Sequence, residues 1–191
     1  MKEALSQITV LEEGPDLEQY QSIPISFEVR SKFEVCEVPG SERFDLVETP
    51  VAPYIKDYDA LEKPSDWPAR FDTQHWGFFT AFEGERRLGR ATIAWKTAEL
   101  NMLEGRLDLA CLWDIRVSPE YRGHGIGKLL FKTAAHWARA RVCTELTIET
   151  QNINVPACRF YESVGCIFHR AIHNAYPAEL NEIQLIWRFE L

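Results

Sequence analysis

The sequence lacks the long apolar runs and the excess of positive charge that mark several classes of protein. No segment reaches the ~18 to 20 consecutive apolar residues of a membrane-spanning helix, and residues 1–6 contain no apolar core of the signal-peptide kind. Lys and Arg total 21 against 29 Asp and Glu, a formal net charge of -8, which disfavours a general binder of nucleic acid or anionic membranes. We therefore expect a cytoplasmic protein whose partners are cationic rather than anionic.

Cysteine pairs and metal-ligand spacings are also missing. The five cysteines are odd in number, widely spaced and form no C-x-x-C pair, so we expect reduced, mostly buried thiols rather than a disulfide framework or a zinc ribbon. The five histidines show no H-E-x-x-H or comparable spacing. The sequence therefore assigns no metal.

The apolar content is sufficient for a single domain, since 46% of the 191 residues are hydrophobic. Helical spacing predicts helices at 128–142 and 155–164, whereas the Pro-rich and acidic segment 50–68 predicts a loop with one turn of helix at 54–61. We expect the weakly patterned residues 1–20 to form an arm or a short helix. Alternating apolar residues predict strands at 23–38 with a break near Arg30, and at 43–51, 76–82, 88–96, 107–117, 146–150 and twice in the tail. This order predicts an α+β fold around a mixed sheet.

Strand 107–117 alternates over its whole length. Leu109, Cys111 and the other odd-numbered residues are expected to face the core, while Asp114 and Arg116 lie on the opposite, polar face. The strand therefore brings a carboxylate to the segment that follows it.

A glycine-spaced loop, Arg122–Gly127, separates this strand from the predicted helix. Unpaired amides and the positive helix end converge there, so we expect the loop to bind an anion. Lys128 stands where a dinucleotide fingerprint needs glycine, and Leu129 where a P-loop needs Ser or Thr, which excludes both nucleotide motifs. The alternative is a turn that only starts a helix.

The loop resembles the [R/Q]-x-x-G-x-[G/A] signature of the GNAT superfamily of N-acetyltransferases. The resemblance continues in the preceding strand, 114–119, and in the run from Asn154 through Tyr161 to Gly165, which is similar to the family's N-x-x-A-x-x-x-Y-x-x-x-G pattern. It covers about residues 76–191. A closer resemblance, carried by segments 52–58, 148–154 and 157–161, is to streptothricin acetyltransferases, which modify an amine of an antibiotic.

The resemblance implies a three-layer mixed α/β fold, in which a mostly antiparallel sheet with two splayed parallel central strands is flanked by helices. It implies one N-acetyltransferase domain over 1–191, with an acetyl-CoA-binding core at 76–191 and a divergent part at 1–70 that contributes to the acceptor site. Acetyl-CoA is then the acyl donor. Its pantetheine arm would pair with Ile115 and Val117 and reach Asn154, and its pyrophosphate would lie on the loop of Arg122, Gly123, His124, Gly125, Ile126 and Gly127.

Acetyl transfer to an amine needs a base and a proton for the leaving thiolate. The resemblance makes Tyr161 the acid, unless it is a buried structural tyrosine, and Glu149 the base, unless it is an ordinary strand carboxylate that faces solvent or pairs with Arg116. Asp114 is a second candidate, either as the base or as a group that grips a cationic acceptor.

The acceptor is expected to be a small cationic amine. Tyr54 and Tyr58 around Asp57 could form an aromatic and carboxylate pocket for an ammonium group, or could be ordinary surface residues. The sequence therefore predicts an N-acetyltransferase for a small amine, with streptothricin and antibiotic resistance as the leading hypothesis. It leaves open a protein or peptide N-acetyltransferase, a non-catalytic acetyl-CoA sensor, and a homodimer.

Overall fold

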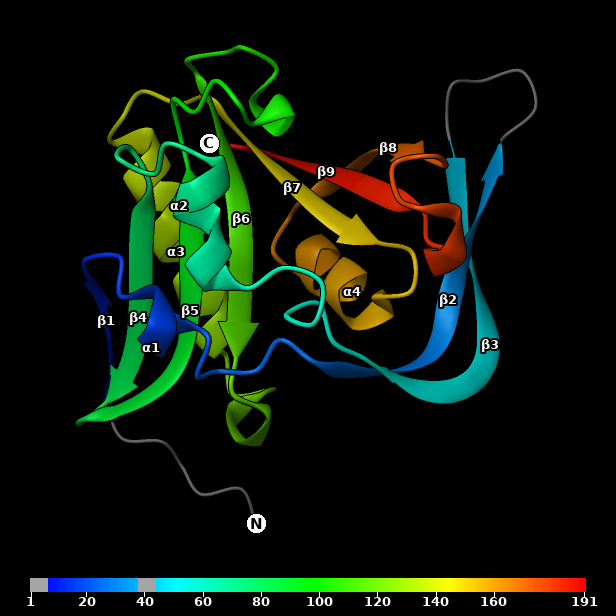
Figure 1. Cartoon of the computed structure of the whole chain (residues 1–191), viewed down its shortest axis with the longest axis horizontal. Coiled ribbons are helices and arrows are strands. Elements are labelled where there is room, and N and C mark those ends of the chain that lie inside the picture. The colour runs from blue at the N-terminus through cyan, green and yellow to red at the C-terminus, as the bar shows by residue number, and fades with distance from the viewer. Residues whose placement is uncertain (1–6, 38–43) are drawn as a thin grey trace. The chain divides into compact units, whose positions relative to one another are not determined.

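The computed structural model describes residues 7–37 and 44–191. Within these ranges strands predominate, with short helices between some of them (Figure 1). In chain order they are β1 (Ile8–Glu12), α1 (Leu17–Tyr20), β2 (Phe27–Glu37), β3 (Phe44–Lys56), α2 (Trp67–Arg70), β4 (Gly77–Glu83), β5 (Arg86–Ala94), β6 (Leu109–Val117), α3 (Ile126–Arg139), β7 (Glu145–Gln151), α4 (Val155–Ser163), β8 (Ile167–Ile172) and β9 (Gln184–Glu190).

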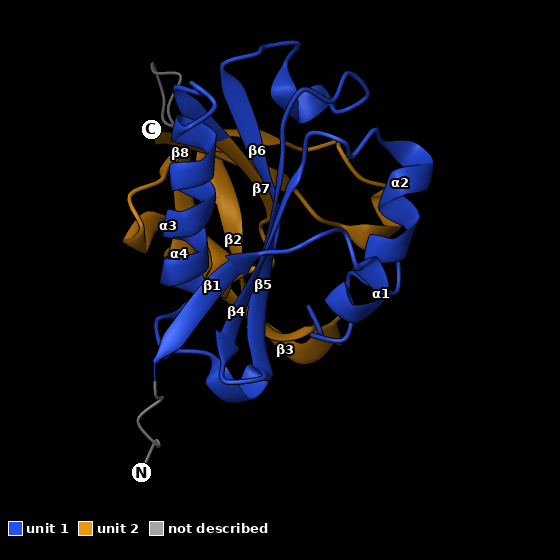
Figure 2. Ribbon diagram, turned by 90° about the vertical axis from the view of Figure 1, so that its left-hand side faces the viewer, with its two compact units in different colours: residues 1–25, 57–146, 191 blue, residues 26–56, 147–190 orange. Residues whose placement is uncertain are grey.

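The chain divides into two compact units, each built from segments that are distant in sequence (Figure 2). Unit 1 holds the described residues up to 25 together with 57–146 and 191, and unit 2 holds those of 26–56 together with 147–190. The prediction of one domain over 1–191 remains a prediction.

Unit 1 is a sheet covered on both faces. Its strands follow the order β1-β4-β5-β6, and each neighbouring pair is antiparallel. Helix α3 packs on one face of this sheet, and the short helices α1 and α2 lie on the other (Figure 2). The mixed α/β fold class predicted from the sequence is confirmed.

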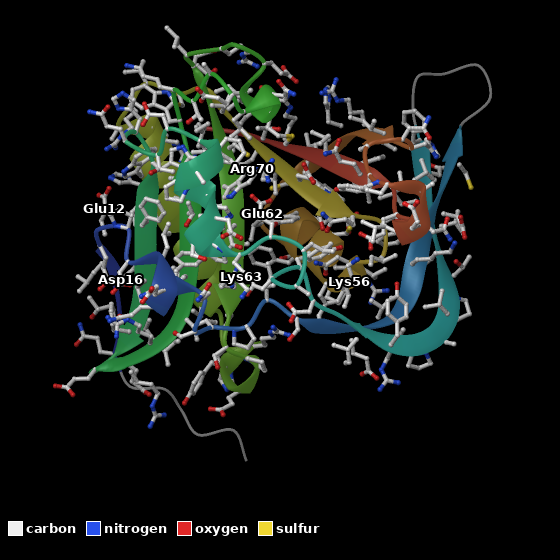
Figure 3. The ribbon with its side chains drawn as sticks, in the orientation of Figure 1. Glu12, Asp16, Lys56, Glu62, Lys63 and Arg70 are labelled. Atoms are coloured by element: carbon white, nitrogen blue, oxygen red, sulfur yellow. The ribbon has the colours of Figure 1, made fainter. Side chains whose placement is uncertain are left out.

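An aromatic cluster fills the space between the sheet of unit 1 and helices α1 and α2. Trp67 of α2 makes edge contacts with Tyr20 of α1 and with Trp113 of β6, at ring-centroid distances of 5.4 and 6.3 Å. At the end of α2, Arg70 pairs with Glu62 at 2.5 Å (Figure 3). Burial of these large rings supplies the free energy that orders a segment whose prolines and acids predicted only a loop.

Unit 2 contains the long antiparallel hairpin β2–β3, the neighbouring strands β7, β9 and β8, and helix α4. The prediction of helical structure from residue 54 is wrong, because β3 continues to Lys56. The hairpin register shifts between Val29 and Ser31, which lie opposite Tyr54 and Pro50. A bulge tolerates prolines, which have no N–H to donate to a ladder, so the strand passes through this Pro-rich segment.

Other predicted elements are found with small shifts at their ends. Helix α3 begins two residues earlier than 128, and the break expected near Arg30 is the bulge itself. Within residues 1–20 the short helix is present as α1, whereas β1, which pairs with β4, was not predicted. No helix in the described part of the chain is both long and apolar enough to cross a membrane.

Candidate functional site

The glycine-rich segment Arg122–Gly127 turns the chain from β6 into α3. Gly123 and Gly125 have φ angles of 81° and 83°, in the left-handed region that side chains with a Cβ disfavour. The first backbone bond of the helix runs from the Leu129 N–H to the Gly125 carbonyl, at 3.1 Å, so the amides just before Leu129 have no acceptor within the helix. A Cβ placed on Gly125 would meet no atom within 4 Å. The segment therefore presents an open, positively polarised helix terminus of the kind that holds anions.

The two polar side chains of this loop are anchored to main-chain carbonyls of neighbouring segments. The Arg122 Nε donates to the Val117 carbonyl at 3.0 Å, and its Nη2 lies 3.5 Å from the Pro24 carbonyl. Burial lowers the pKa of Arg122. The His124 Nδ1 lies 3.1 Å from the Tyr121 carbonyl. These bonds keep both side chains beside the turn, where the sequence predicted phosphate contacts.

Strand β5 lies close to both β6 and the first turn of α3 at Gly89. A Cβ on Gly89 of β5 would lie 2.9 Å from the Arg116 carbonyl oxygen and within 3.2 Å of Leu130 and Ile126. Side chains do not tolerate such distances, so a glycine is needed here for the first turn of α3 to pack against the strand.

The predicted faces of β6 are wrong in its second half. Asp114 and Arg116, placed by alternation on a polar face, are buried, whereas Ile115 and Val117 are partly exposed. The pairing of β6 with β5 passes over Trp113, and one extra residue exchanges the two faces of a strand. Ile115 and Val117, the residues expected to pair with a pantetheine arm, therefore lie on the less buried face.

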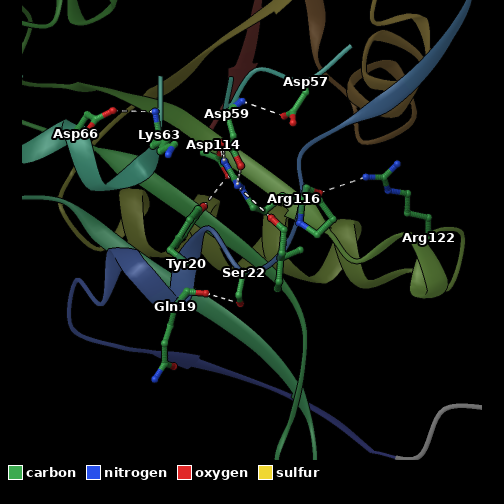
Figure 4. A network of polar contacts seen from close by, with 12 residues as sticks. Gln19, Tyr20, Ser22, Asp57, Asp59, Lys63, Asp66, Asp114, Arg116 and Arg122 are labelled. Carbon is green, nitrogen blue, oxygen red and sulfur yellow. Dashed lines mark hydrogen bonds and ion pairs between the residues drawn. The ribbon is translucent and has the colours of Figure 1, made fainter. Parts of the chain in front are cut away.

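The buried face of β6 carries an ion network centred on Arg116 (Figure 4). The guanidinium donates to both oxygens of Asp114, at 3.0 and 2.7 Å, and to both oxygens of Asp59, at 2.8 and 3.1 Å. A fifth bond, of 3.1 Å, goes to the Ile23 carbonyl, so all five N–H donors of this side chain are used. Burial alone would lower the pKa of Arg116, but the Asp114 carboxylate raises it.

Asp114 also accepts a hydrogen bond from the Tyr20 hydroxyl, at 2.7 Å. Burial, and then the negative charge of Asp114, raise the pKa of Tyr20 well above its ordinary value, so this phenol remains a donor. With three bonds on its two oxygens, Asp114 ties helix α1 and the loop at Asp59 to β6 through Arg116. The Asp114 carboxylate is therefore occupied by hydrogen bonds and an ion pair within unit 1.

Glu149 lies in a different environment, a polar cluster of unit 2. One carboxylate oxygen accepts from the Tyr176 hydroxyl and the other from the Gln184 amide, each at 2.6 Å. The Tyr176 oxygen in turn accepts from the Gln151 Nε2 at 3.0 Å. Because side chains of a strand repeat every two residues, Glu149 and Gln151 of β7 share one face and meet the same tyrosine. Sequence reasoning missed Tyr176 and Gln184, which come from a turn and a strand distant along the chain.

Tyr161 lies on α4, and Asn154 is the N-cap residue of that helix. Tyr161 is 6% exposed, and its ring packs on Phe160 and Trp187, at centroid distances of 5.4 and 6.4 Å. The Asn154 Oδ1 caps the helix by accepting from the Ala157 N–H at 3.2 Å, so a bond from Asn154 to a pantetheine would use its Nδ2. Both residues keep the roles predicted for them as hypotheses.

Asn152 is a buried residue that sequence reasoning also missed. Its backbone and its side-chain amide both bond to the main chain of Phe33, at 2.8 and 2.9 Å, and both bond to that of Ile183, at 3.0 and 2.9 Å. Asn152 therefore bonds on one side to β2, at Phe33, and on the other to Ile183, just before β9. The family pattern, which begins at Asn154, gave no indication of this role of Asn152.

Tyr54 is an exposed residue of β3 in unit 2. Partial burial, and then the charge of Glu182, raise its pKa. Lys56, two residues on, forms an ion pair with the buried Glu182 (Figure 3). A buried ion pair of this kind holds the end of the hairpin in place.

Asp57 and Tyr58, the other residues predicted to bind the acceptor, belong to unit 1. The Asp57 Oδ1 accepts from the Asp59 N–H at 3.1 Å (Figure 4). The turn closed by this bond positions Asp59 for its ion pair with Arg116. Their joint role with Tyr54 in acceptor binding stays a prediction.

The thiols and the potential metal ligands form no further site in the described ranges. All five cysteines are free, and four are buried, as expected; burial raises the pKa values of Cys158 and Cys166 to about 12. Within residues 7–37 and 44–191 no three His, Cys, Asp or Glu side chains gather as metal ligands.

Comparison with known proteins gives consistent matches. Residues 44–166 match the Acetyltransferase (GNAT) family. A streptothricin acetyltransferase of Escherichia coli is 34% identical over 158 residues, which cover 81% of this chain and 81% of that protein. These matches confirm the resemblance identified from the loop and from the Asn154–Gly165 pattern, and with it the enzyme class.

Two solved structures cover nearly the whole chain. A protein described as a streptothricin acetyltransferase of Bacillus anthracis, in complex with acetyl coenzyme A, has a TM-score of 0.78 at 25% identity and covers 97% of this chain and 100% of its own. A nourseothricin acetyltransferase has a TM-score of 0.74 at 25% identity, with 97% and 99% covered. The similarity therefore extends beyond the shared motifs into the N-terminal third.

Proposed function

The chain belongs to the acetyltransferase (GNAT) family, and we propose that it transfers the acetyl group of acetyl-CoA to a primary amine of a small cationic molecule of the streptothricin type. The observation that carries the proposal is the glycine loop before α3, whose left-handed Gly123 and Gly125 leave the helix amides open to a diphosphate. The choice of acceptor is supported by the streptothricin acetyltransferase of Escherichia coli and by the two solved structures.

The residues of unit 1 fit the coenzyme. The amides of Gly123, Gly125 and Gly127 and the side chain of Arg122 would bind its pyrophosphate, and the partly exposed residues Ile115 and Val117 would hold its pantetheine arm. When bound, acetyl-CoA supplies the activated thioester.

We assign the base to Glu149 rather than to Asp114. Both carboxylates carry hydrogen bonds, but Asp114 is held at both oxygens by the guanidinium of Arg116, whereas Glu149 accepts from the neutral groups of Tyr176 and Gln184, among its other interactions. Asp114 is also buried, and the two bonds to that guanidinium fix it within the ion network of unit 1. Glu149 would take the proton from the amine, directly or through one water.

Tyr161 is proposed as the group that gives a proton to the departing thiolate. It stands seven residues after Asn154, as in the family pattern, and its ring is held by Phe160 and Trp187. A phenol fixed by packing is pre-oriented for proton transfer.

Acceptor binding is assigned to Tyr54, Asp57 and Tyr58. Aromatic rings and a carboxylate are suited to an ammonium group, and the formal charge of -8 attracts cationic substrates. A small amine in the cytoplasm is the proposed partner, and a homodimer remains an open expectation.

Release of coenzyme thiol tests the proposal. The enzyme is mixed with acetyl-CoA and streptothricin, lysine or a short peptide in turn, and the thiol is read with a colorimetric reagent. Because Cys36 is exposed, the assay uses a Cys36→Ser background. Turnover with streptothricin alone supports the proposal. Turnover only with the peptide identifies a peptide acetyltransferase, and coenzyme binding without turnover on any amine identifies a sensor.

Two variants separate the catalytic roles. Glu149→Gln should remove the acidic limb of the pH profile of kcat/KM and lower the rate by about 10² or more. Tyr161→Phe should lower kcat with little change in KM. Full kcat in Tyr161→Phe would exclude the acid role, and an unaltered pH profile in Glu149→Gln would exclude the base.

A further inference from the structure

We propose that Tyr176 and Gln184 are positioning residues for Glu149, which hold its carboxylate in one orientation and in its charged form until the amine arrives. The inference rests on the proposed role of Glu149 as the base. It adds two residues that lie outside the sequence motifs of the family resemblance.

The geometry fixes the carboxylate from two sides. The Tyr176 hydroxyl donates to one oxygen and the Gln184 amide to the other, both at 2.6 Å, which prevents rotation of the carboxylate plane. A carboxylate oxygen has capacity for more than one hydrogen bond, so these two donors do not by themselves exhaust the group.

A chain of donors points towards Glu149. Gln151 donates to the Tyr176 oxygen at 3.0 Å, and that hydroxyl donates onward. The bond from Gln151 polarises the hydroxyl and strengthens its own donation. Each hydrogen bond stabilises the ionised carboxylate, which is the form that can accept a proton from the amine.

The charges around Tyr176 keep it a donor. Burial, and then the negative charge of Glu149, raise the pKa of Tyr176 far above its ordinary value, with a smaller contribution from Glu182. Glu182 is itself paired with Lys56 of β3. Tyr176 therefore stays protonated over the whole range in which an acetyltransferase would be assayed, and its proton stays directed at Glu149.

The test is the pH profile of kcat/KM in Tyr176→Phe, with Tyr121→Phe as the matched control. The control removes a phenol hydroxyl that bonds to Arg86 rather than to a carboxylate. Loss of one hydrogen bond to the anion should move the acidic limb of Tyr176→Phe to higher pH by about one unit. The limb of Tyr121→Phe should not move.

Gln184→Met provides a second, independent variant and keeps the experiment decisive if Tyr176→Phe does not fold. It removes the other donor at similar volume and should move the limb in the same direction. In a Glu149→Gln background, neither substitution should have a further effect on the profile.

The outcomes are distinguishable. A limb that disappears in Glu149→Gln but stays in place in Tyr176→Phe and Gln184→Met overturns the positioning role and leaves the proposed function intact. A limb that persists in Glu149→Gln overturns the base assignment, and the inference fails with it.

Discussion

Replacement of Asp114 by Asn tests whether this carboxylate is part of the chemistry or of the architecture. Asn can still accept from Tyr20 and from the Arg116 Nε at one oxygen, but it places an NH₂ group against the Arg116 Nη2, which now donates to Asp114 at 2.7 Å. One bond to a charged group is lost, worth about 1.5–3 kcal/mol, and a buried guanidinium loses one of its two counter-charges. We expect a loss of about 3 kcal/mol in the free energy of unfolding.

The assay is urea and thermal unfolding, followed by circular dichroism. For a chain of this length 1 kcal/mol corresponds to about 2–4 °C in Tm, so Tm should fall by about 6–12 °C. Glu28→Gln is the control: it breaks an ion pair with Arg30 in which both side chains are exposed, and such pairs contribute less than about 1 kcal/mol.

Kinetics of the same Asp114→Asn protein complete the test. Below its melting temperature the acidic limb of kcat/KM should remain where it is in the parent enzyme. A variant that is as stable as the parent but has lost that limb would refute the reasoning, because Asp114 would then be the base and the ion network would be dispensable.

Four further outcomes are expected. Gly125→Ala should weaken acetyl-CoA binding about tenfold in calorimetry, because a left-handed φ costs a residue with a Cβ roughly 1–2 kcal/mol; Gly14→Ala, at a position without that conformation, should not. Asn152→Ala should lower the free energy of unfolding by about 2–3 kcal/mol in urea, since two buried side-chain bonds are lost. A thiol reagent should modify only Cys36 rapidly in the native protein, and Cys36→Ser should abolish that phase. Burial raises the pKa of Cys158 from its ordinary 9.0 to about 12, so its contribution to stability is complete below pH 9.0 and is lost as pH rises towards 12; Cys158→Ala should flatten this decline.

Local patterns predicted most of the fold. Helices α3 and α4, with their apolar spacing, and strands β4 and β5 follow from short-range rules that act within a few residues. The glycine turn before α3 was predictable for the same reason, since its glycines and the helix after it are contiguous.

The missed features depend on partners far along the chain. A bulge at Trp113 inverted the faces of β6, and no periodicity in the strand itself signals where its neighbour will skip a residue. The buried ion network was missed because Asp59, which shares the Arg116 guanidinium with Asp114, lies in a loop of no regular pattern. Gln184 could be linked to Glu149 only after β7 and β9 were seen as neighbours, and Tyr176 only after the turn between β8 and β9 was located.

The interleaving of the two units bears on how the polypeptide acquires its structure during translation. Hairpin β2–β3 leaves the ribosome early, yet the bonds that join Phe33 to Asn152 span 119 positions. Until the later half emerges, an extended ribbon with unpaired edges is exposed, which favours association between nascent chains. Closing so long a loop is slow, so we expect chaperone binding to nascent chains that end before residue 147.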